Sequence, residues 1–75
     1  MRQKEIPEEV KIVGQNINDL LKQKNLKIST VAHDADMDSE ALRRYVKSTQ
    51  IMGIDKAIKI ARALQVDISE LFKGI

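Results

Sequence analysis

Apolar residues recur at intervals of three, four and seven along most of this chain, which is the spacing of one helix face. No window alternates between apolar and polar residues as a half-buried strand does. The two clearest stripes are Val10, Val13, Ile17, Leu20 and Leu21, and later Ile54, Ala57, Ile58, Ala61 and Leu64. The pattern predicts an all-α domain with five helices over about residues 7–24, 28–35, 39–47, 54–64 and 68–73.

Residues at the expected helix ends agree with these ranges. Pro7 suits a first helical position, and Asn25 tolerates the left-handed conformation that ends many helices. Asp67, followed three residues later by Glu70, resembles a capping box at the start of the last helix.

The length of 75 residues indicates one domain, residues 1–75, and not two. Without cysteine the chain has neither disulfides nor a thiolate zinc site, and we expect no metal and no cofactor. No apolar run reaches the roughly 20 residues that span a bilayer, and the charged N-terminus does not resemble a signal peptide. We therefore expect a cytoplasmic protein without a membrane partner. Residues 1–6 are either a frayed end or an arm that touches DNA or a partner.

Residues 26–48 carry the strongest indication of function. They predict two short helices separated by the polar turn Asp36-Met37-Asp38, and the second helix carries Arg43 and Arg44. A helix-turn-helix with a basic second helix is typical of proteins that insert side chains into the DNA major groove.

Candidate DNA contacts follow from which side of helix 39–47 faces outward. Leu42 and Tyr45 lie three residues apart and are expected to face the core. Arginine can donate two hydrogen bonds to guanine, and glutamate can accept one from the cytosine amino group. The expected base contacts are Ser39, Glu40, Arg43 and Arg44, and the expected phosphate contacts are Lys27, Lys47, Ser48, Thr49 and Gln50.

Acidic residues beside this surface leave a second interpretation open. Asp34, Asp36 and Asp38 would repel phosphates and weaken binding to any DNA sequence. Glu40 is either a specificity determinant or a sign that the surface does not bind DNA.

From Val13 to Phe72 the chain resembles the lambda-repressor-like (Cro/XRE) helix-turn-helix domains. The resemblance rests on VGQNINDLLKQKNL in the first helix, Val31-Ala32, Ala35, Met37, Leu42 and Arg44 around the next two, and IARALQVDISELF at the end. It implies a compact five-helix domain, with helices 2 and 3 as the helix-turn-helix, and a transcriptional regulator acting as a dimer on a palindromic operator. By position, Ser39, Glu40, Arg43 and Arg44 fall where that family contacts base edges.

The chain departs from the family at several positions. Asn25, Asp36 and Ser48 stand where the family usually has glycine. Asparagine and aspartate adopt positive φ with little strain, whereas Ser48 is harder to explain. Lys27-Ile28 replaces a frequent Ser-Gln pair, so a helix cap and a polar contact are lost.

Apolar residues outside the expected core allow either local packing or a partner surface. They are Ile51, Met52, Ile54, Phe72 and Ile75, to which we assign a homodimer interface.

We expect a sequence-specific DNA-binding regulator, a repressor that inserts helix 39–47 into the major groove. The alternative is a protein-interaction module on the same scaffold, such as an antitoxin or antirepressor-type regulator, with weak or no DNA binding. An enzyme is not expected, because His33 is the one histidine and no Gly-rich phosphate loop is present.

Overall fold

Four α-helices and one short 3-10 helix follow one another in a computed structural model, which describes residues 7–75. They are α1 (Glu8–Lys24), α2 (Ile28–Asp34), α3 (Ser39–Val46), α4 (Ile54–Leu64) and the 3-10 helix η1 (Ile68–Phe72). No strand occurs between residues 7 and 75, and the predicted all-α class is confirmed. The expected role of residues 1–6 lies outside the described residues.

The prediction of a fifth α-helix over 68–73 is wrong, because the segment forms a 3-10 helix of five residues. The Glu70 N–H donates to the Asp67 carbonyl over 2.9 Å, which is the shorter hydrogen-bond step of a 3-10 helix. The Asp67 side chain makes no capping hydrogen bond, so the expected capping box is absent from this segment. Pro7 likewise precedes α1 instead of starting it, since its ψ of 151° is extended.

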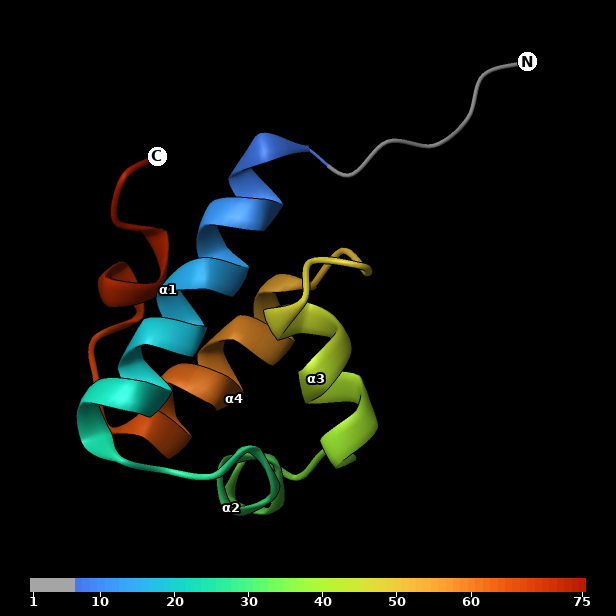
Figure 1. Ribbon diagram of the computed structural model, residues 1–75, viewed down its shortest axis with the longest axis vertical. Helices are drawn as coiled ribbons and strands as arrows, with labels where there is room; N and C mark the ends of the chain where they lie inside the picture. The colour runs from blue at the N-terminus through green and yellow to red at the C-terminus, as the bar shows by residue number, and fades with distance from the viewer. Residues whose placement is uncertain (1–6) are drawn as a thin grey trace.

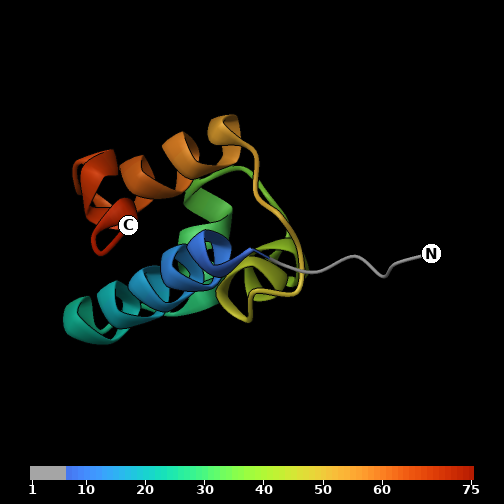
Figure 2. The same cartoon turned by 90° about the horizontal axis from the view of Figure 1, so that it is seen from above.

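The elements surround a single core, with α2 and α3 at one side. Figure 1 shows α2 end-on below α1 and α4, while α1 lies across the view, so that α2 crosses α1 steeply. Figure 2 shows α1 and α4 on opposite sides of the molecule. The 3-10 helix η1 contacts both α1 and α4, and α3 contacts both α1 and α2. This arrangement holds α3 from two sides and leaves its remaining surface free.

Each element contributes at least one large side chain to the core. The largest fully buried side chains are Ile17, Val31, Leu42, Ile60, Leu64 and Leu71. No polar or charged side chain within residues 7–75 is buried. Apolar burial is therefore the main source of stability in the described domain.

All four α-helices are followed within two residues by a residue that is not glycine but has positive φ. Asn25, Asp36, Ser48 and Gln65 have φ of 57°, 59°, 62° and 61°. Each end carries two hydrogen bonds typical of a Schellman motif. At α1, for example, the Asn25 N–H donates to Lys22 O (3.2 Å) and the Leu26 N–H to Leu21 O (2.9 Å). After three of these ends an apolar residue, Leu26, Met37 or Val66, packs against the core.

Gly14 and Asn16 of α1 determine how closely two neighbouring segments pack against that helix. An ideal Cβ added to Gly14 would lie 2.6 Å from the Tyr45 carbonyl oxygen and 2.9 Å from that of Val46. The absence of a side chain at Gly14 therefore lets the end of α3 lie directly against α1. Two residues along, the Asn16 side-chain amide donates to the carbonyl oxygens of Leu71 and Lys73, both over 2.9 Å, and ties the C-terminal segment to α1.

Candidate nucleic-acid interface

The helix-turn-helix of α2 and α3 is confirmed, and one left-handed residue sets the turn between them. Asp36 has positive φ, and the next residue, Met37, donates its N–H to the Ala32 carbonyl over 3.0 Å. The Met37 side chain is partly buried and packs against the core. Ala32 and Ala35 are buried, and their small size lets α2 approach its neighbours closely.

One face of α3 is fixed in the core and the other is open to solvent. Leu42 and Tyr45 are buried, with Leu42 completely inaccessible, as the sequence predicts. Glu40, Arg43 and Arg44 are exposed. Side chains on the open face can therefore reach the major groove of DNA without any movement of the helix backbone.

The structure brings the four predicted base-contact residues onto the first two turns of α3. Ser39 starts the helix and is half-buried. Glu40 and Arg43 form an ion pair with 3.3 Å between Oε1 and Nη1. Arg44 forms no ion pair with any other residue between 7 and 75. The two adjacent arginines therefore differ, because one is paired and the other is not.

The predicted phosphate contacts lie at the ends of the two helices. Lys27 precedes α2 and is exposed, but α2 begins without a side-chain cap, as expected from the loss of the usual Ser-Gln pair. Lys47, Thr49 and Gln50 are exposed after α3, whereas Ser48 is half-buried. The Thr49 hydroxyl already donates to the Arg44 carbonyl over 3.2 Å, so its hydrogen helps to close the end of α3.

Carboxylates cluster at the turn between α2 and α3. Asp34, Asp36 and Asp38 are all exposed, and Asp34 lies 3.7 Å from the exposed ring of His33. Asp38 precedes α3 but makes no side-chain capping hydrogen bond. The candidate interface is thus basic along α3 and acidic at the turn.

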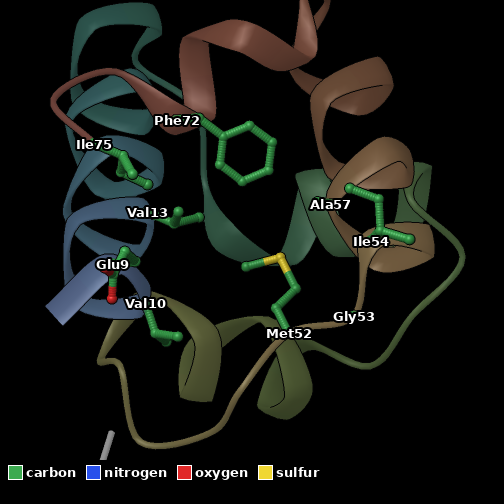
Figure 3. Close-up of a pocket in the computed structure, with 9 residues that line it drawn as sticks. All are labelled: Glu9, Val10, Val13, Met52, Gly53, Ile54, Ala57, Phe72 and Ile75. Carbon is green, nitrogen blue, oxygen red and sulfur yellow. The ribbon is translucent and has the colours of Figure 1, made fainter. Parts of the chain in front are cut away.

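The predicted dimer surface is brought together around one apolar groove. Figure 3 shows Val13, Met52 and Phe72 around this space, with Ile54 at the start of α4 and Ile75 near α1. The groove has a volume of about 240 Å³. Ile51 does not line it but is 59% exposed, next to Met52 in the loop before α4. Val46, the last residue of α3, packs against the core.

Residues 7–75 hold no group of three or more histidine, cysteine, aspartate or glutamate side chains placed to ligate a metal ion. None of the helices within this range has the length and apolar character needed to cross a bilayer.

Comparison with known proteins gives the arrangement a context. The model of the Cro/C1-type HTH DNA-binding domain matches residues 16–75. The restriction-modification controller protein C.AhdI from Aeromonas hydrophila superposes with a TM-score of 0.83 and 23% identity, over 88% of this chain and 100% of that chain. The clp gene regulator ClgR from C. glutamicum superposes with a TM-score of 0.82 and 11% identity, over 87% of this chain and 84% of that chain. No curated protein matches the sequence.

Proposed function

Because the chain belongs to the Cro/C1-type helix-turn-helix family and is a DNA-binding transcriptional regulator, we propose that it is a cytoplasmic repressor that inserts α3 into the major groove of a palindromic operator. The observation that carries the proposal is the division of α3 into two faces. Leu42 and Tyr45 anchor one face in the core, and Arg43 and Arg44 stand exposed on the other. Such a helix can present arginines to bases at a fixed orientation.

The proposed contacts divide into two classes. Ser39, Glu40, Arg43 and Arg44 face the bases, and Arg43 and Arg44 are suited to the O6 and N7 acceptors of guanine. Lys27, Lys47, Ser48, Thr49 and Gln50 lie toward the phosphates, where they set position and add salt-dependent affinity. Lys47 supplies positive charge at the end of α3, whereas the carboxylates of the turn weaken binding to every DNA sequence.

Replacing Arg44 by alanine is expected to weaken binding to the operator by about 1–3 kcal/mol, because one bidentate base contact is lost. Preference at one base position should relax at the same time. The operator is first obtained by selecting bound sequences from random DNA, and affinities are then measured by fluorescence anisotropy over a range of salt concentrations. Arg62→Ala is the matched control, since it removes the same charge from an exposed position on α4.

The proposal that Arg44 contacts a base is wrong if Arg44→Ala leaves both operator affinity and sequence preference unchanged. Complete lack of DNA binding at low salt, together with a stable complex with another protein, would instead favour the protein-interaction module. The exposed side chains of Ile51, Ile54 and Ile75 would then be its first candidate contacts.

We further propose that two copies associate through the apolar groove and the loop before α4. The groove collects Met52, Ile54, Phe72 and Ile75 on one side of the molecule, and Ile54 is 63% exposed. Covering these side chains removes apolar surface from water, which favours association. A two-fold dimer on a palindromic operator would hold its two α3 helices about 34 Å apart, to read successive major grooves.

Ile54→Gln is expected to raise the dimer dissociation constant by about tenfold or more. Burial of an isoleucine side chain contributes about 1.5–3 kcal/mol, and a two-fold dimer contains the site twice. Sedimentation velocity over a range of protein concentrations measures the change. Ile58→Gln makes the same substitution on α4 outside the groove and should leave the dimer intact. Equal effects of both variants, or no effect of Ile54→Gln, would contradict this interface.

A further inference from the structure

Glu40 and Arg43 are already joined on the surface that faces DNA in the proposed function. The Glu40 Oε1 and the Arg43 Nη1 lie 3.3 Å apart, in a hydrogen-bonded pair three residues apart on the same side of α3. Both side chains remain accessible, at 68% for Glu40 and 45% for Arg43. A ligand can therefore reach Arg43 without first separating it from Glu40.

The way in which the pair is made leaves a defined set of donors free. A guanidinium has five N–H donors in a rigid planar fork. Glu40 occupies Nη1, so the edge formed by Nε and Nη2 stays open. These two nitrogens donate in parallel directions, as a bidentate contact with guanine O6 and N7 requires. Glu40 thus restricts Arg43 to orientations in which this edge points away from its own carboxylate.

We propose that Glu40 is a positioning residue and not one of the base contacts proposed for α3. It acts on base recognition through Arg43 and does not itself contact a base. This inference rests on the proposed function, because it assumes that α3 enters the major groove. Arg44 has no such partner among residues 7–75 and serves as the internal comparison. Recognition by Arg43 depends on Glu40, whereas recognition by Arg44 does not.

Glu40 has a second effect that must be separated from positioning. Its negative charge repels phosphates and lowers affinity for every DNA sequence alike. This effect cancels in the ratio of affinities for operator and random DNA, whereas the orientation of Arg43 changes that ratio. Since an exposed ion pair contributes little, its loss should reduce the ratio by about two- to fivefold.

Two variants at position 40 separate the acceptor from the charge. Glu40→Met removes both, and Glu40→Gln removes the charge but keeps an oxygen that can accept from Arg43. Both should raise affinity for random DNA equally. Glu40→Met should lower the operator-to-random ratio by about two- to fivefold, and Glu40→Gln should lower it less. The loss should fall on the base position that Arg43→Ala also relaxes.

The decisive measurement repeats Glu40→Met in an Arg43→Ala background, as a double-mutant cycle. If Glu40 acts through Arg43, Glu40→Met no longer changes the ratio in that background. Glu70→Met is the control, since it breaks another ion pair of the same spacing, with 2.9 Å between Glu70 Oε1 and Lys73 Nζ, on η1. All these positions lie outside the buried core, and thermal unfolding followed by circular dichroism checks that each variant is folded.

Two results would overturn the positioning role. An equal fall of the ratio in both backgrounds would mean that Glu40 contacts a base directly. An unchanged ratio with higher affinity for all DNA would mean that Glu40 acts only by its charge. Failure of the proposed function is seen earlier and separately, because the unaltered chain would then select no operator from random DNA.

Discussion

Leu42→Ala is expected to lower the free energy of unfolding by about 2–5 kcal/mol, the largest effect of any substitution considered for this domain. Leu42 is completely buried on the inner face of α3, and its removal leaves a cavity between that helix and the core. A domain of this length has a total stability of about 4–11 kcal/mol. The substitution therefore removes a large share of the stability and can unfold the domain at moderate temperature.

Urea unfolding followed by circular dichroism measures this loss. Ile58→Ala is the matched control, because it deletes the same number of carbon atoms from a residue that is 38% exposed. Its cost should stay below about 1 kcal/mol, since little additional surface becomes unpacked. Equal costs for Leu42→Ala and Ile58→Ala would show that the inner face of α3 is not anchored as the structure has it. DNA affinity of Leu42→Ala should fall in proportion to the unfolded fraction.

Gly14→Ala is expected to destabilise the domain by about 1–3 kcal/mol, although the same change in an isolated helix is favourable. The new Cβ would lie 2.5 Å from the Ser48 side-chain oxygen and closer than 3.0 Å to two carbonyl oxygens at the end of α3. Backbone atoms cannot turn aside as a flexible side chain can. The helices α1 and α3 must therefore separate, and α3 is the helix that carries the proposed base contacts.

Gly53→Ala is the control for this prediction. Its Cβ would meet only the Asp55 carboxylate oxygen, at 2.8 Å, and that oxygen can rotate away. Gly53 also has a φ of −75°, which alanine adopts without strain. Thermal unfolding of both variants should show a clear fall in midpoint for Gly14→Ala and a small change for Gly53→Ala. A stabilised Gly14→Ala variant would contradict the close approach of α1 and α3.

The helices and the helix-turn-helix could be predicted from sequence because their signals are local. Apolar spacing shows which face of a helix is buried, and Asn25 and Asp36 are residue types that tolerate positive φ. Gln65 gives no such signal, although it adopts the same conformation at the end of α4. There the requirement comes from the packing of Val66 against the core, which the sequence of the turn does not reveal.

Other features depend on contacts between distant parts of the chain. Periodicity does not report how closely two helices approach, so nothing marked Gly14 as special. The sequence of the last helix does not distinguish a 3-10 helix from a short α-helix either. In the candidate interface, the sequence predicts that Arg43 and Arg44 are exposed, since Leu42 and Tyr45 define the buried face of α3. The proximity of Glu40 and Arg43 can be predicted from their spacing alone, because residues three apart on a helix are neighbours.

The side-chain amide of Asn16 has a consequence for the order in which the domain assembles. Its two hydrogen bonds join residues that are 55 and 57 positions apart, whereas the pairing of α2 with α3 involves neighbouring segments. Closing a long loop costs more chain entropy than closing a short one, so distant contacts form late unless they are strong. We therefore expect the C-terminal segment to dock in the last step of folding and to exchange its amide hydrogens first in the native state.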